Sequence, residues 1–186
     1  MKTGLYILSL FSMFMLSCSA LTGLPNPDTA EHKKLKVIEV IDGDDIVLAD
    51  KTRIRLIGID APETYPGKNA EPYTGIAKKA LERLLLGKDV LVQYGAEEKD
   101  LYNRHLAYVY LENSESPLKS SENATYNGFL FVNGYLVKMG HAVPRRYSAI
   151  NNDYELLLFD FLIEARQFRR GIWAHEWDEN RYKSVN

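Results

Sequence analysis

The sequence predicts an α+β fold that is mainly a small β-barrel of five strands, with about three helices. Five short segments alternate apolar and polar residues between turn residues, which is typical of strands. Between the third and the fourth segment, apolar residues recur every three or four positions, which is typical of a helix. Five strands with a helix between the third and the fourth is the order of the OB-fold. The 186 residues show no internal repeat and no shift in composition, so we expect one folded domain.

The N-terminal residues carry the pattern of an export signal. Lys2 is followed by an apolar run at 5–16 and then by small residues, and this run is too short to span a bilayer. Cys18 is the only cysteine of the chain, and it follows Met-Leu-Ser, a loose form of the lipobox that precedes the acylated cysteine of bacterial lipoproteins. We therefore expect residues 1–17 to be a signal peptide and Cys18 to be lipidated. Cleavage after Ala20 without a lipid is the alternative.

The segment after this signal is predicted to be a spacer. Residues 18–34 contain proline, glycine and asparagine with little periodicity, which indicates a flexible tether. The folded domain is expected at 35–178, followed by a C-terminal tail at 179–186. Ser19 directly follows the expected lipid site. A serine at this position resembles the pattern of lipoproteins that are transported to the outer membrane. We thus expect a lipid-anchored protein on the periplasmic or surface face of a bacterial membrane.

Three strands joined by tight turns are predicted to open the domain. They are expected at 35–41, 46–49 and 53–59. In the third strand, Leu56, Ile57 and Ile59 can pack in a core, and Pro62 ends the hydrogen bonding of the strand.

A helix is predicted from Tyr73 to Leu86 and is ended by Gly87. Its apolar positions form one face, and Lys and Glu residues form the other. That face comprises Ile76, Ala77, Ala80, Leu81, Leu84 and Leu85. The fourth and fifth strands are expected at 89–94 and 106–111.

The last third of the domain is predicted to be helical after a long loop. Residues 112–128 are rich in Ser, Glu and Asn, which indicates a mobile surface loop. A short helix is expected at 132–139, ended by Gly140. A longer helix is expected at 152–169, with apolar residues almost all around it. We expect this helix to lie between the barrel and the C-terminal segment.

Charge and composition exclude two classes of site. The net charge of −2 excludes a polycationic protein that binds nucleic acid through bulk electrostatics, so any such binding must depend on local cations. The four histidines are scattered and there is a single cysteine, so no spacing suggests a zinc site. The histidines are expected to be plain surface or packing residues.

Charged residues gather where predicted strands begin and end, in three short segments. These are Val40–Val47, Arg55–Glu63 and Asp100–Tyr108. Asp44 and Asp60 are candidate ligands of a hard divalent cation, which prefers oxygen. Arg55 and Arg104 are candidates for binding phosphate, because a guanidinium offers a planar pair of donors and keeps its charge. Glu63 is a candidate general base or water-positioning group.

Two more acids stand in the first segment. Asp42 is predicted to cap the backbone of its own turn. Asp45 is expected either to tighten the metal site or to face solvent. Neither is predicted to be catalytic.

The three segments together resemble the thermonuclease family, whose type member is staphylococcal nuclease, and the resemblance runs from about Leu35 to Trp173. It implies a calcium-dependent nuclease that hydrolyses DNA and RNA by in-line attack of water and leaves 3′-phosphate ends. Asp44 and Asp60 would bind calcium together with the backbone carbonyl of Ala61. Arg55, Glu63 and Arg104 would be catalytic. The sequence departs from the family at Asp45, where a threonine is usual.

The resemblance also implies substrate contacts and alternatives. Tyr102 and Tyr147 are candidates to stack on or hydrogen-bond a nucleotide, with single strands preferred because aromatic faces reach unpaired bases. We expect a monomer. An inactive nucleic-acid-binding module, as in the nuclease-like repeats of Tudor staphylococcal nuclease proteins, and a surface adhesin are the alternatives. Retention of all three catalytic candidates disfavours both.

Overall fold

The protein is described here by a computed structural model that covers residues 33–63, 73–117, 124–146 and 152–174. The predicted signal peptide, Cys18, most of the tether, Tyr147 and the C-terminal tail lie outside these residues, so what the sequence predicts for them stays a prediction. Within the described residues, no helix is both long and apolar enough to cross a membrane.

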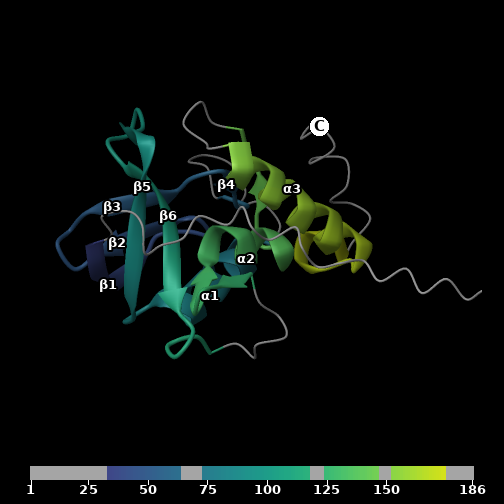
Figure 1. Cartoon of the computed structure of the whole chain (residues 1–186), viewed down its shortest axis with the longest axis horizontal. Coiled ribbons are helices and arrows are strands. Elements are labelled where there is room, and N and C mark those ends of the chain that lie inside the picture. Colours follow the sequence, from purple (N-terminus) through teal and green to yellow (C-terminus); the bar gives the residue numbers. More distant parts are fainter. Residues whose placement is uncertain (1–32, 64–72, 118–123, 147–151, 175–186) are drawn as a thin grey trace, which may run out of the picture.

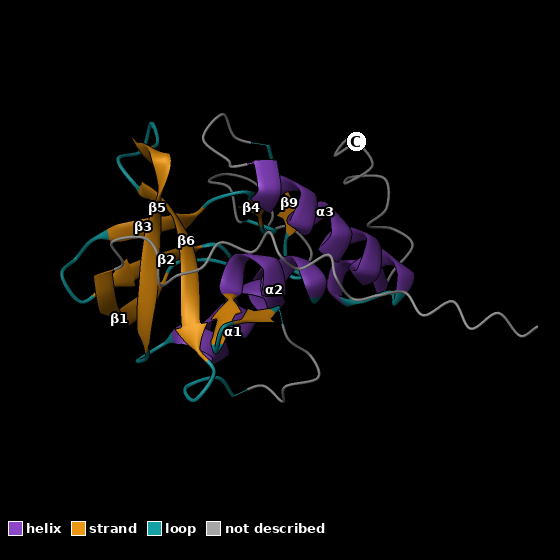
Figure 2. Cartoon of the chain, in the orientation of Figure 1, coloured by secondary structure: helices purple, strands orange, loops and turns teal. Residues whose placement is uncertain are grey.

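Five strands form the ring of paired strands that an OB-like barrel requires. They are β1 (Lys33–Val40), β2 (Asp45–Leu48), β3 (Arg53–Leu56), β5 (Asp89–Lys99) and β6 (His105–Glu112). The order is β3-β2-β1-β5-β6, and β3 also pairs in parallel with β6, which joins the two ends of the series. Figures 1 and 2 show these strands as one body. The predicted α+β, OB-like class is therefore confirmed.

The barrel core follows the alternation in the sequence. Apolar side chains from every one of the five strands are fully buried, and examples are Val37, Ile46, Leu48, Ile54, Leu56, Val90, Val92 and Val109. Among the residues of these strands whose burial is described, the buried charged ones are Asp45 and Arg55, next to Asp44. Buried charge in a core of this kind costs free energy unless it is paired. The departure from the apolar pattern therefore marks the functional region.

The single strand predicted at 53–59 is wrong. The backbone turns at Ile57 and Gly58, and Gly58 takes a left-handed φ of 79°. The chain then continues as β4 (Ile59–Asp60), which leaves the barrel and pairs with β9 (Val143–Pro144). Because of this turn, residues on either side of Gly58 face one another across a short distance.

The predicted loop at 112–128 is only partly a loop. The chain makes a turn after Glu112 and later forms β7 (Thr125–Tyr126), which pairs with β8 (Phe129–Phe131). β8 in turn pairs with β6 and extends the sheet. The polar composition concealed β7, because this strand is stabilised by pairing with β8 rather than by an apolar pattern of its own.

The three expected helices are present. They are α1 (Thr74–Leu85), α2 (Val132–Lys138) and α3 (Asn152–Gln167), and a 3₁₀ helix, η3 (Gly171–Ala174), follows. α1 buries Ala77, Leu81, Leu84 and Leu85 and contacts β1. Ile76, predicted on this inner face, is instead exposed.

The two later helices form a second layer beside the barrel. α2 contacts both β6 and α3, and α3 contacts β9 and η3 (Figure 1). α3 also contacts the barrel directly, because the ring of Tyr154 stacks on Tyr108 of β6 with 3.8 Å between centroids, and the Tyr154 hydroxyl donates to Gln93 of β5 at 2.8 Å. Two apolar residues of α3, Leu156 and Ile163, are exposed, as is Phe168 directly after the helix.

The hairpin of β5 and β6 is longer than predicted. β5 continues past Tyr94 to Lys99, with an irregular register before the turn to β6. Figure 1 shows this end of the hairpin projecting beyond the rest of the barrel. The turn at its tip carries Arg104.

Candidate active site

Asp44 lies at the centre of the candidate site, just before β2. The side chain is fully buried. Its Oδ2 accepts a hydrogen bond of 2.6 Å from the backbone N–H of Ala61 and forms an ion pair of 2.5 Å with Arg55 Nη1. Its Oδ1 is buried and has no hydrogen-bond partner among the described residues. Burial raises the pKa of Asp44 well above its ordinary value, and Arg55 opposes this effect.

Arg55 joins the two aspartates that the sequence predicts as metal ligands. Its Nη1 meets Asp44, and its Nη2 donates to Asp60 Oδ1 at 2.9 Å. The turn at Gly58 makes this possible, because it returns the chain toward β3 only five residues after Arg55. The guanidinium is only 2% exposed, so Arg55 lies beneath the surface of the site.

Asp60 receives a second cation that the sequence did not predict. Arg145, next to β9, donates from Nη1 to Asp60 Oδ1 at 3.0 Å, and its backbone N–H donates to Gly58 O. The pairing of β4 with β9 brings the two residues together. No local pattern signals this contact, because 85 residues separate Arg145 from Asp60.

Three carboxylates are gathered within the reach of one cation. Single oxygens of Asp42, Asp44 and Glu63 all lie within 4.8 Å of one another. Asp42 also caps its own turn as predicted, because its Oδ1 accepts from the backbone N–H of Asp44 at 3.1 Å. Asp42 is thus an acid of the cluster that sequence reasoning assigned to the turn alone. Asp60 is not one of these three acids, but Arg55 forms ion pairs with both Asp44 and Asp60 and so connects Asp60 to the cluster.

Glu63 is half-buried at the edge of this cluster. Burial raises the pKa of its carboxyl above the ordinary value, and the nearby Arg55 opposes the rise. Its backbone carbonyl accepts a hydrogen bond of 3.2 Å from Thr74 Oγ1 at the start of α1. A carboxylate with a raised pKa beside a group of other acids suits proton transfer with water.

Arg104 is held at the tip of the β5–β6 hairpin. Its Nε donates to Asp100 Oδ2 at 2.7 Å, while Asp100 Oδ1 accepts from the backbone N–H groups of Tyr102 and Arg104. Asn103 adopts a left-handed φ of 62°, which asparagine tolerates, and so keeps the tight turn. Although burial alone lowers the pKa of Arg104, hydrogen bonds to Asp45 and Asp100 raise it above its ordinary value.

Asp45 does neither of the two things predicted for it. The side chain is fully buried rather than facing solvent, and it turns toward two arginines rather than toward the acidic cluster. Arg53 Nη2 donates to its Oδ2 at 2.6 Å, and Arg104 Nη1 donates to the same oxygen at 2.9 Å. Asp44 lies just before β2 and Asp45 is its first residue, and these two adjacent carboxylates have different partners.

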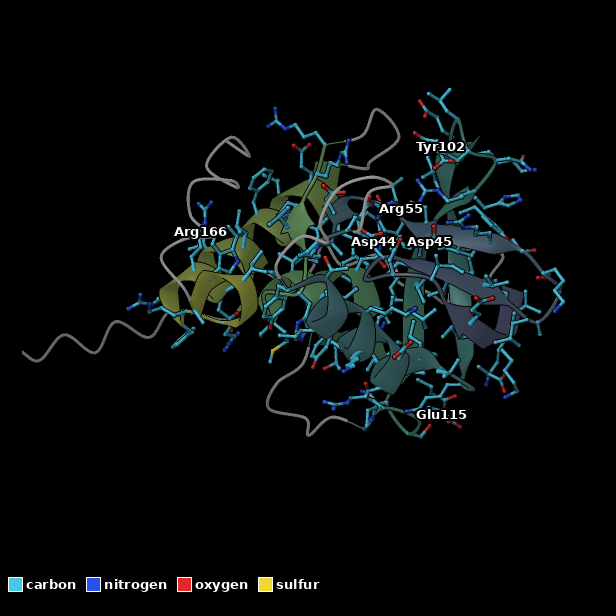
Figure 3. The ribbon with its side chains drawn as sticks, turned by 180° about the vertical axis from the view of Figure 1, so that it is seen from behind. Asp44, Asp45, Arg55, Tyr102, Glu115 and Arg166 are labelled. Carbon is cyan, nitrogen blue, oxygen red and sulfur yellow. The ribbon has the colours of Figure 1, made fainter. Side chains whose placement is uncertain are left out.

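Figure 3 shows Asp44, Asp45 and Arg55 together on the barrel, with Tyr102 on the projecting hairpin nearby. Tyr102 is 79% exposed, and its ring centroid lies 5.3 Å from Arg104 Cζ. The structure therefore brings Asp44, Asp60, Arg55, Glu63 and the backbone of Ala61 into one region, bordered by Arg104. The role of each residue stays a prediction.

Sequence reasoning missed the roles of three charged residues of this region, Arg53, Asp100 and Arg145, and it did not predict the arginine partners of Asp45. A signal was available for the pair of Asp45 and Arg53. Positions 53 and 55 of one strand share a face, and the acids of the preceding turn lie across the hairpin from them. Asp100 could have been recognised as an aspartate that closes a turn.

Comparison with known proteins agrees with this arrangement. The family described as staphylococcal nuclease homologues matches residues 53–175. The chain is 32% identical to a thermonuclease of Staphylococcus hyicus, over 82% of this chain and 81% of that protein. It is 33% identical to a thermonuclease of Staphylococcus intermedius, over 74% of each chain.

A similar relative is found outside staphylococci. The chain is 32% identical to a protein of Escherichia coli O157:H7 named as an uncharacterized endonuclease, over 75% of this chain and 76% of that protein. The alignments with these three relatives cover 74–82% of this chain.

Proposed function

The chain belongs to the staphylococcal nuclease family and is a nuclease, a hydrolase of phosphodiester bonds; from this we propose that it is a calcium-dependent enzyme that cleaves both DNA and RNA. One observation carries the proposal. The buried and unpartnered Oδ1 of Asp44 lies in a group of three carboxylates, and arginines flank this group. An unpartnered buried oxygen is costly unless a bound group satisfies it.

The donor set fits calcium. Calcium binds six to eight oxygens, from carboxylates, backbone carbonyls and waters, in a flexible geometry. Asp44 would supply the buried carboxylate and Asp60 the second one, and the carbonyl of Ala61 would be a third ligand. Asp42 and Glu63 would complete the surroundings directly or through water. A bound divalent cation would supply positive charge for a phosphoryl oxygen and would make a nearby water more acidic.

The protein residues then have distinct tasks. Glu63 acts on the attacking water, as a general base or by positioning it, so that its oxygen reaches phosphorus in line with the leaving group. The P–O5′ bond breaks, and the products carry a 3′-phosphate and a 5′-hydroxyl. Arg104 and Arg55 stabilise the charge that develops on the phosphoryl oxygens. Arg55 also holds Asp44 and Asp60 close together.

We further propose that single strands are preferred. Tyr102 is exposed on the projecting hairpin beside Arg104, where a base could stack on its ring while its phosphate meets the arginine. The net charge of −2 argues against strong attraction of long duplexes by the whole surface. Binding would thus depend on the local cations of the site.

A hydrolysis assay on the purified protein tests this function. Single-stranded DNA and RNA should be cleaved with calcium and not after its removal by a chelator. Glu63→Gln and Arg104→Ala should each lower kcat by roughly 100-fold or more with KM changed only a few-fold, because both residues act on charge that appears in the transition state. Asp44→Asn should raise the calcium concentration needed for half-maximal rate.

Glu115→Gln is the matched control for Glu63→Gln. Glu115 lies in the turn after β6, at the other end of the barrel from Asp44 (Figure 3), and Lys88 contacts only its backbone carbonyl. This variant should cleave like wild type. Cleavage that does not need calcium, or a Glu63→Gln variant as fast as wild type, would contradict the mechanism.

A further inference from the structure

Asp45 is a buried carboxylate shared by two arginines from two different elements. Arg53, in β3, approaches with Nε at 2.9 Å from Oδ1 and with Nη2 at 2.6 Å from Oδ2. Arg104, at the tip of the β5–β6 hairpin, approaches with Nη1 at 2.9 Å from Oδ2. Asp45 is fully buried, whereas Arg104 is 15% exposed and Arg53 is 46% exposed. The carboxylate therefore connects the hairpin tip to the wall of the barrel.

Two carboxylates hold the guanidinium of Arg104, each at a different nitrogen. Asp100 holds Nε from within the hairpin turn, four residues away, and Asp45 holds Nη1 from β2, 59 residues away. A planar guanidinium that is fixed at both Nε and Nη1 has a fixed orientation. Neither carboxylate contacts Nη2, so this group stays available for an oxygen of the substrate.

The two carboxylates differ in what they fix. Asp100 moves with the hairpin tip, because it belongs to the same turn as Arg104. Asp45 belongs to the barrel next to Asp44, so it fixes Arg104 relative to the carboxylate cluster. A threonine, the residue that is usual at this position in the family, has no charge with which to pair with two guanidinium groups.

We propose that Asp45 is a positioning residue that holds the Arg104 guanidinium in a fixed position relative to the carboxylate cluster. The inference rests on the catalytic role proposed above for Arg104. Arg53 neutralises Asp45 from its other side and so allows a charged residue to be buried there. Without Asp45, only the hairpin turn would hold Arg104, and a displacement of about 1 Å at a reacting centre lowers rates by roughly 100-fold.

A purely structural role for Asp45 would produce a different pattern. Loss of one partner from a buried ion pair destabilises a protein wherever the pair lies. It would lower the amount of folded enzyme or its melting temperature without acting through Arg104. The test must therefore ask whether the effect of Asp45 on turnover depends on Arg104.

The experiment is a double-mutant cycle on the purified protein with a fluorescent single-stranded oligonucleotide and saturating calcium. Asp45→Asn should lower kcat by about 10- to 100-fold with KM within about threefold of wild type. In the Arg104→Ala background, Asp45→Asn should lower kcat no further. Non-additivity of this kind shows that the two residues act through one interaction.

Two controls separate positioning from stability. Glu164 in α3 likewise forms ion pairs with two cations, Lys138 at 3.3 Å and Arg170 at 2.8 Å, but lies in the helical layer. Glu164→Gln should lower the melting temperature and leave kcat unchanged. Arg53→Gln should leave kcat within a few-fold of wild type, because Asp45 still holds Arg104.

The outcomes are distinct. The inference is overturned if Asp45→Asn retains the wild-type kcat, or if its effect multiplies with that of Arg104→Ala. If Arg104→Ala itself cleaves like wild type, the proposed role of Arg104 fails, and the inference that depends on it fails as well. Should Asp45→Asn alone not fold, the same cycle is run with Asp45→Asn combined with Arg53→Gln, which removes the cation that Asp45 no longer neutralises.

Discussion

Asn133 shows how one buried amide connects the helical layer to the region of the site. It lies in α2 with no exposed surface, and its Nδ2 donates to the carbonyl of Ile57 at 2.9 Å. Its Oδ1 accepts from the backbone N–H of Val109 at 3.0 Å. Ile57 is in the turn that directs the chain from β3 to β4. Asn133 therefore supports the bend that brings Asp60 back to Arg55.

Asn133→Ala should lower the free energy of unfolding by about 2–4 kcal/mol, because it leaves a buried carbonyl and a buried N–H without partners. Urea unfolding at neutral pH measures this. The matched control is Asn113→Ala, since Asn113 is exposed in the turn after β6 and hydrogen-bonds there through its backbone N–H. A loss below about 1 kcal/mol at Asn133 would mean that other groups satisfy the two backbone atoms.

At the scale of elements, two glycines set how η3 is joined to α2. Gly140 ends α2 with φ +69°, and Gly171 begins η3 with φ +55°. The two backbones touch, because Ile172 N–H donates to Gly140 O at 2.9 Å. A Cβ on Gly140 would lie 2.2 Å from the carbonyl oxygen of Arg170. Close packing of this kind seats Trp173, which is buried, with Arg166 Cζ 4.5 Å from its ring centroid.

Gly140→Ala should therefore destabilise the protein by more than the roughly 1–2 kcal/mol expected for a left-handed alanine alone. Thermal unfolding compares it with Gly87→Ala at the end of α1. Gly87 has φ +78° but no atom within 4 Å of its would-be Cβ, so it reports the backbone cost without the clash. If both variants lose the same free energy of unfolding, the contact between α2 and η3 accommodates the added Cβ at no cost, which would contradict this prediction.

At the scale of the whole molecule, acid stability depends in part on one half-buried histidine, His141. Burial lowers the pKa of His141 to about 4. The ring stacks on Tyr73, with 5.9 Å between centroids, and lines a pocket with Ile76, Leu84 and Tyr135. The imidazole is thus a packing residue, as the sequence predicted, between α1 and α2.

This pKa makes the fold less stable in acid. Between pH 6.5 and about 4 the unfolded chain binds a proton at His141 that the folded chain does not. The free energy of unfolding should therefore fall as the pH falls through this window, by up to about 3 kcal/mol. His141→Gln should flatten that part of the profile in urea titrations at a series of pH values.

Wild type and variant are compared at each pH, because Asp44 and Glu63 contribute with the opposite sign. Their carboxyls have raised pKa values in the folded state, so the folded chain binds protons more readily there than the unfolded chain does. A profile for His141→Gln parallel to that of wild type would contradict the role assigned to His141.

The sequence by itself determined the class of fold, the helices, most of the strands and the segments that form the site. These follow from local patterns: an apolar period of two or of three to four, glycines that end helices, and charged residues at the ends of apolar runs. The parts that it did not predict are short or stabilised from elsewhere. β4 and β9 have two residues each and exist because they pair with one another, while β8 pairs with β6 and β7 pairs with β8.

Only the tertiary structure decided which charges meet. The acids at 42, 44 and 45 are alike in the sequence, yet Asp44 turns to the carboxylate cluster and Asp45 to two arginines. The pairing of Arg55 with both Asp44 and Asp60 depends on the backbone turn at Gly58, and Arg145 reaches Asp60 across 85 residues. The physical reason is that buried charges must be paired, and the partner is whichever opposite charge the barrel brings within hydrogen-bond distance, however far away it lies in the chain.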